Sequence, residues 1–77
     1  MATHPRIIRD PNVVFGKPAI AGTRISVEFI LDLLAAEATE AEILENYPHL
    51  SHEDILACVA YARDLVAEQK ALPSAAE

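Results

Sequence analysis

The chain contains 77 residues, which is enough for one domain. A domain of this size buries a smaller fraction of its surface than a large domain does and is only marginally stable alone, so we expect it to bind a partner. Apolar residues supply 52% of the sequence and aromatic residues only 5%, and because there is neither a run of about 18 apolar residues nor a secretion leader, we expect a cytoplasmic protein outside the membrane. The net charge of −6 divides into +3 for residues 1–24 and −9 for residues 25–77. Because residues 25–77 are acidic, we do not expect them to bind phosphate groups without a basic partner.

Residues 1–25 are expected to form a small β arm. Arg6 to Arg9 and Val13 to Phe15 are short runs of strand-forming residues, and Ala19 to Ala21 is a third extended piece. Turn-forming residues separate these runs, namely Asp10-Pro11-Asn12, Gly16-Lys17-Pro18 and Gly22. Strands this short are marginal in isolation, so we expect a helix or a second chain to cover them.

Residues 26–72 are expected to form three helices, of which the first two are short. Apolar residues recur at helical spacing after Ser26, the expected N-cap, and continue to Leu34. The second helix begins with a capping box, in which Thr39 accepts from the backbone N–H of Glu42 and Glu42 reaches back. It ends before Pro48, which cannot continue a helix.

The third helix opens at Ser51, with Asp54 three residues later and a hydrophobic staple between Leu50 and Ile55. Residues 55–66 are almost all apolar, which is too broad for a helix that faces one small core. One face is expected to pack on the first two helices and the other on a second subunit, giving a homodimer. The expected dimer contacts are Leu56, Val59, Ala60 and Val66. Residues 73–77 are expected to be a disordered tail of this single domain.

Two stretches carry a family resemblance: GKPAIAGTRISV from Gly16 to Val27 and ILENYPHLSHEDILACVAYA from Ile43 to Ala62. Together they resemble the domain of unknown function 433 family over nearly the whole chain. The resemblance implies an antitoxin of a toxin-antitoxin pair, with a helix-turn-helix core. The expected fold is therefore mostly α, a short N-terminal β arm followed by a three-helix core of the homeodomain-like or winged-helix-like kind.

The chain departs from the family between the first two helices, where the family usually has a glycine and this chain has Glu37 and Ala38. A left-handed helix end would strain Glu37 by about 1 kcal/mol. We therefore expect a longer or differently wound connection at this point.

Contacts to nucleic acid or to a protein partner are expected from the basic third of the chain and from the first turn of the third helix, the recognition position of a helix-turn-helix. The residues are Arg6, Arg9, Lys17, Arg24 and His52. Glu53 and Asp54 follow His52 and are unfavourable beside phosphates, so direct groove reading by the free protein is not expected.

Catalysis, metal binding and cofactor binding are not expected. No Ser/His/Asp or Cys/His set is evident, and the segment from Gly16 to Arg24 lacks the spacing of a phosphate loop. His49 and His52 are permissible metal ligands, but one lies in a turn and the other on a helix, so their convergence is not assured. Cys58 has apolar neighbours and is expected to be a buried hydrophobe more than a reactive thiol.

Three functional hypotheses follow from these patterns. The first is an antitoxin-like homodimer that binds a basic, nuclease-type toxin and then operator DNA as a complex. The second is a DNA-binding regulator without a toxin, in which dimerisation places two basic arms beside the duplex. The third is a structural adaptor that only oligomerises.

Overall fold

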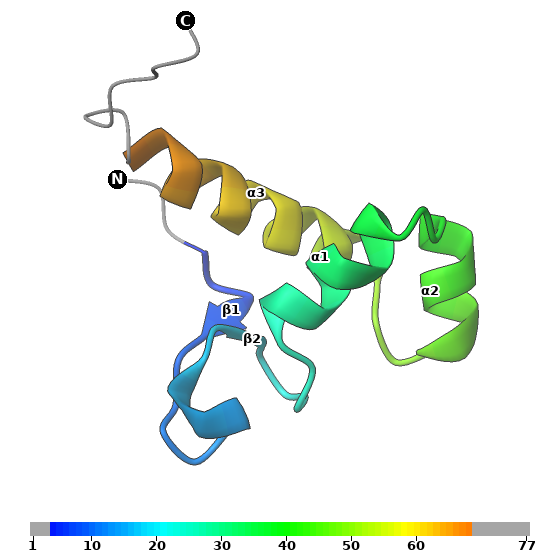
Figure 1. Ribbon diagram of the computed structural model, residues 1–77. Coiled ribbons are helices and arrows are strands. Elements are labelled where there is room, and N and C mark those ends of the chain that lie inside the picture. The colour runs from blue at the N-terminus through cyan, green and yellow to red at the C-terminus, as the bar shows by residue number, and fades with distance from the viewer. Residues whose placement is uncertain (1–3, 69–77) are drawn as a thin grey trace, which may run out of the picture.

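Three helices follow a small β arm, as the sequence predicts, in a computed structural model that describes residues 4–68. The elements are β1 (Ile7–Ile8), the 3₁₀ helix η1 (Val14–Gly16), β2 (Ala19–Ile20), α1 (Val27–Ala35), α2 (Glu40–Asn46) and α3 (His52–Glu68). In Figure 1, α3 is the longest element, α1 crosses against it, α2 lies beyond α1, and the arm projects to one side. The predicted helix end at Leu72 and the predicted tail 73–77 lie outside the described residues.

The arm is a two-stranded antiparallel sheet that is tied to the start of α1. Ile7 pairs with Ile20 and Ile8 pairs with Ala19. The chain then turns at Gly22, whose φ is 81°, and returns so that the backbone N–H of Val27 donates to Pro18 O at 2.9 Å. Ala19 and Ile20 are buried. The expectation that a helix would cover these short strands is therefore confirmed.

The predicted strand from Val13 to Phe15 is wrong, because this segment is the 3₁₀ helix η1 with left-handed backbone. The φ values of Val14, Phe15 and Gly16 are 50°, 56° and 79°. An Asx turn starts the reversal, since the Asn12 N–H donates to Asp10 Oδ1 at 2.8 Å. The turn is then closed by the Lys17 N–H, which donates to Val14 O at 3.0 Å. These local bonds outweigh the strand propensity of the three residues.

The predicted helix starts are confirmed, because each is held by the side chain that the sequence indicates. Ser26 Oγ accepts from the Phe29 N–H at 2.9 Å. Thr39 and Glu42 form the complete capping box. At α3, the Asp54 N–H donates to Ser51 Oγ at 3.2 Å and the Ser51 N–H donates to Asp54 Oδ2 at 3.0 Å. These bonds satisfy amide groups that a helix start leaves without partners.

The connection between α1 and α2 corrects the expectation of a longer or differently wound link. Glu37 takes the left-handed conformation itself, with φ of 72°. The Ala38 N–H donates to Leu33 O at 3.0 Å and the Glu37 N–H donates to Leu34 O at 2.9 Å. This pair of bonds is a Schellman motif, which normally carries glycine at the left-handed position. The chain keeps the short turn at the cost of strain at Glu37.

The core lies where β2, α1, α2 and the first half of α3 meet, and it is built from aliphatic side chains and Cys58. Leu50 and Ile55, the predicted staple pair, both belong to it. The burial of Cys58, expected from its neighbours, is confirmed. The buried cluster consists of Ile20, Val27, Ile30, Ile43, Leu50, Ile55 and Cys58.

Candidate interaction surface

The outward face of α3 is an exposed apolar stripe. Leu56, Val59 and Val66 are 51%, 43% and 72% exposed, and they lie three and seven residues apart, which places them on one side of a helix. A shallow hollow of about 500 Å³ extends along this side. Its lining residues are Val59, Ala62, Arg63, Val66 and Ala67. We call the set Leu56, Val59, Ala60, Arg63 and Val66 the α3 stripe, and it contains the four residues predicted to form a dimer contact.

The N-terminal segment is tied to α3 by a hydrogen bond from a histidine ring and by an ion pair. His4 Nε2 donates to Asp64 Oδ2 at 2.8 Å, and Arg6 Nη1 donates to Asp54 Oδ1 at 3.1 Å. Edge-to-face packing of the His4 and Tyr61 rings, with centroids 5.3 Å apart, supports the first bond. Because Asp54 is buried between Arg6 and Ser51, its carboxylate is structural and does not face a groove beside His52.

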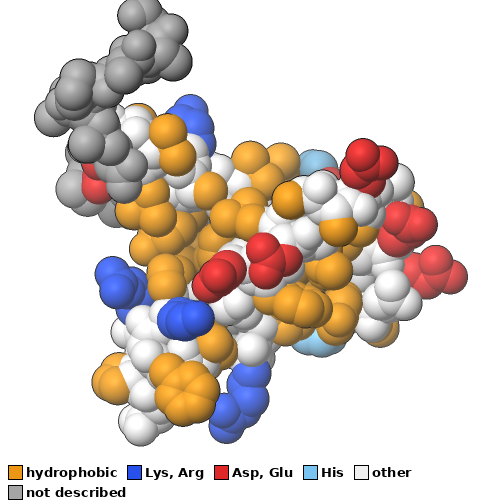
Figure 2. All heavy atoms as spheres, in the orientation of Figure 1, with side chains coloured by type: hydrophobic (Ala, Val, Ile, Leu, Met, Phe, Trp, Pro, Cys, Tyr) orange, Lys and Arg blue, Asp and Glu red, His pale blue; other side chains and the backbone are white. Residues whose placement is uncertain are grey.

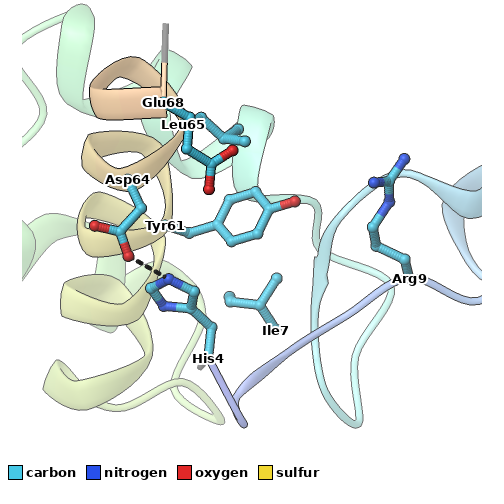
Figure 3. A pocket seen from close by; sticks show the side chains of 7 residues that line it. All are labelled: His4, Ile7, Arg9, Tyr61, Asp64, Leu65 and Glu68. Atoms are coloured by element: carbon cyan, nitrogen blue, oxygen red, sulfur yellow. Dashed lines mark hydrogen bonds and ion pairs between the residues drawn. The ribbon is translucent and has the colours of Figure 1, made fainter. Parts of the chain in front are cut away.

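Asp64 accepts the first of these bonds and a second one from its neighbour on α3. The Arg63 Nε donates to its Oδ1 at 2.7 Å, and this bond, followed by the bond from His4, lowers the pKa of the Asp64 carboxyl. Figure 3 shows the His4 ring pointing toward Asp64, with Tyr61 beside it and Arg9 on the other side of the cleft. This cleft has a volume of about 350 Å³. The arrangement holds the start of the chain against α3.

The five predicted contact residues lie in three settings, and one of them, Arg6, is held by Asp54 as described above. Arg9, Lys17 and Arg24 are exposed on the arm, where the Arg9 Nε donates a long bond to Gly16 O at 3.5 Å and the Lys17 Nζ lies 3.4 Å from Glu28 Oε1. His52 lies at the start of α3, where its ring pairs with the Glu40 carboxylate on α2. The structure therefore places these three cations on the arm and His52 on the acidic side, beside Glu40.

The acidic side is formed by α1 and α2. Residues 25–62 contain eight carboxylates and neither lysine nor arginine. Figure 2 shows acidic side chains over these helices and basic side chains over the arm. A positively charged partner is expected to be attracted to the helices and a negatively charged one to the arm.

Phe15 is the exposed residue that sequence reasoning missed. It is 96% exposed in η1, at the outer end of the arm, while Arg9 bonds to Gly16 beside it. The sequence offered one signal, a phenylalanine directly before a Gly-Lys-Pro turn in a chain with only two phenylalanines. Because Val13 to Phe15 also reads as a strand, that signal was ambiguous.

A second apolar hollow lies between α1 and α3, next to the arm. It has a volume of about 260 Å³ and adjoins the α3 stripe, since Ala62 lines both hollows. We call it the α1–α3 groove. Its lining residues are Lys17, Pro18, Val27, Glu28, Leu31, Tyr61, Ala62 and Leu65.

The described residues 4–68 contain no group of three or more His, Cys, Asp or Glu side chains that could hold a metal ion. Burial, followed by the charge of Asp54, raises the pKa of the Cys58 thiol to about 11. Cys58 therefore stays protonated near neutral pH and is a poor nucleophile. Within the same residues, no helix combines the length and the apolar character needed to cross a membrane.

Comparison with known proteins identifies the family. The model of the family described as protein of unknown function (DUF433) matches residues 7–62. No curated protein matches the chain. A crystal structure of a DUF433 member protein from Anabaena variabilis ATCC 29413 is 32% identical in sequence, with a TM-score of 0.76 over 82% of this chain. The match spans 62% of that protein's length. The chain therefore belongs to the DUF433 family.

Proposed function

We propose that the protein is an antitoxin-like component of a toxin-antitoxin pair, which acts in the cytoplasm by binding and not by catalysis. The observation that carries this proposal is the run of eight carboxylates without a lysine or arginine in residues 25–62, most of them displayed on α1 and α2. A field of one sign attracts a partner of the opposite sign and speeds its association. A nuclease-type toxin, which must bind a polyanion, presents such a positively charged surface.

Homodimerisation through the α3 stripe is part of this proposal. A small domain rarely exposes several large apolar side chains on one helix face unless they meet a partner. Leu56, Val59 and Val66 are arranged in that way. Two copies related by a twofold axis would cover the stripes mutually and place two acidic surfaces, one per subunit, on the outside of the dimer.

The test is co-expression of the tagged chain with the product of a neighbouring gene. We expect a stable stoichiometric complex that weakens as salt is added. The variant Asp32→Lys/Glu45→Lys, which reverses two exposed carboxylates that make no hydrogen bond with another described side chain, is expected to weaken the complex by about tenfold or more. The matched variant Asp32→Asn/Glu45→Gln is expected to have an intermediate effect. A chain that never captures a neighbouring product would contradict the proposal.

A second candidate function is a DNA-binding regulator without a toxin. Four exposed cations on the arm, Arg6, Arg9, Lys17 and Arg24, favour it, because a dimer would carry eight of them. In this case the isolated protein binds duplex DNA, and its affinity falls steeply between low and moderate salt. Absence of binding by the isolated protein, with binding by the toxin complex, would favour the antitoxin.

A further inference from the structure

We propose that Phe15 is the anchor of the homodimer, and that the phenyl ring of one copy occupies the α1–α3 groove of a second copy. This inference rests on the homodimer of the proposed function and adds an interface that the α3 stripe does not include. It begins from the backbone of η1. Val14, Phe15 and Gly16 all have positive φ, and for a β-branched valine this conformation is a costly exception.

The strained turn holds the ring away from its own chain. Phe15 is 96% exposed, although the apolar groove of the same chain begins three residues away at Pro18. Folding alone gains nothing from a fully hydrated aromatic side chain, which is among the largest sources of binding energy when it enters a pocket. Strain that displays such a side chain indicates a binding role.

The groove is suited to receive this ring. Its walls are the apolar side chains of Pro18, Val27, Leu31 and Leu65, with the ring of Tyr61, and its volume of about 260 Å³ has room for a phenyl group. Glu28 at its edge is exposed and lies 3.4 Å from the Lys17 Nζ of the same chain. In a dimer, Arg9 beside Phe15 of one copy would approach this Lys17–Glu28 pair of the other copy, where the Glu28 carboxylate can accept from both cations.

A second copy is the occupant that fits the geometry best. The projecting ring and the groove are neighbours on one chain, because Lys17 and Pro18 line the groove and directly follow η1. A projection beside a matching hollow allows two copies to exchange both contacts about a twofold axis. Ala62 joins the groove to the α3 stripe, so both contacts fit into one continuous interface.

The first test measures the dimer dissociation constant by analytical ultracentrifugation. Phe15→Ala is expected to weaken dimerisation by about 100-fold, since a twofold interface loses the contact twice at about tenfold each. Phe15→Leu keeps an apolar side chain and is expected to retain most of the affinity. Circular dichroism should show unchanged helix content in both variants. A Phe15→Ala protein that dimerises like the wild type overturns the inference while leaving dimerisation through the α3 stripe intact.

The second test locates the ring by disulfide trapping between copies. Phe15→Cys protein is mixed with Leu31→Cys protein under mild oxidation, and we expect a covalent heterodimer whose linked peptides are identified by mass spectrometry. The matched control replaces Phe15→Cys with Phe29→Cys, because Phe29 packs on Tyr47 of α2 and is not part of the groove. Equal trapping by the control overturns the inference. A wild-type chain that stays monomeric also overturns the inference. The same holds if Phe15→Ala loses toxin binding but dimerises normally. Neither of these two results disproves toxin binding by the protein.

Discussion

At the scale of single residues, Glu37 shows how a turn can keep its shape without the residue that suits it. The Schellman bonds to Leu33 and Leu34 fix a left-handed conformation that glycine adopts without a steric penalty. A substitution at Glu37 breaks no side-chain hydrogen bond, because this side chain is exposed and makes none with another described residue. The backbone alone therefore sets the effect of a substitution here.

We predict that Glu37→Gly raises the free energy of unfolding by about 0.5–1 kcal/mol. The relief of left-handed strain exceeds the extra entropy that glycine gives the unfolded chain. Urea denaturation followed by circular dichroism measures this difference. Glu37→Ala is the control, because it removes the carboxylate but keeps the Cβ atom. Equal stability of the two variants would show that strain is not the cause.

At the scale of elements, Asp64 is one of two carboxylates that hold the N-terminal segment against α3. Asp64 accepts from Arg63 and from His4, and these bonds lower its pKa below the ordinary value of an aspartate. A lowered pKa in the folded state means that the stabilisation is present above the pKa of the unfolded chain. It is lost as the pH falls through the lower pKa of the folded chain.

We predict that Asp64→Asn lowers the melting temperature at neutral pH and that the difference from the wild type vanishes at acidic pH, where the wild-type carboxyl is also protonated. Thermal melts across a pH series measure this convergence. Glu68→Gln is the control, since Glu68 lies one turn further along α3 and lines the same cleft without accepting from His4. A difference that persists unchanged into strong acid would mean that the ionised carboxylate of Asp64 does not stabilise the fold.

The helix starts could be predicted because their signals are local. Ser26, Thr39 and Ser51 each accept from an amide only three residues away. The left-handed turn of η1 could not be predicted in the same way. Its conformation depends on the Asx turn before it and on the strand pairing that encloses it, and neither outcome is encoded in the propensities of Val14 and Phe15.

At the scale of the whole molecule, α3 is covered on one side only. Sequence pattern predicted that residues 55–66 have two apolar faces, and the structure buries Ile55 and Cys58 while leaving Leu56 and Val66 in water. The exposed face is the one that the sequence pattern assigned to a partner, since Leu56, Val59 and Val66 are among the expected contacts. The structure places these residues and the cations of the arm at the surface, and their contacts stay predictions, whereas the Phe15 projection was not predicted.

We predict that Val66→Glu abolishes the concentration dependence of the melting temperature that a dimer shows. Val66 is 72% exposed, so its replacement leaves the core intact while it places a charge inside the proposed contact. Ala41→Glu, an exposed change on α2 with the same added charge, should leave the dependence as it is. Identical behaviour of both variants would contradict dimerisation through the α3 stripe.

The separation of charge along the chain decides which chemical probes can report on its contacts. Lys17 is the single lysine among residues 4–68, and the next trypsin site after Arg24 is Arg63. Digestion therefore releases α1, α2 and most of α3 as one long peptide, and amine-directed reagents attach to the described side chains only on the arm. A partner seated on the acidic helices would escape such reagents, and carbodiimide coupling through carboxylates is the chemistry that would find it.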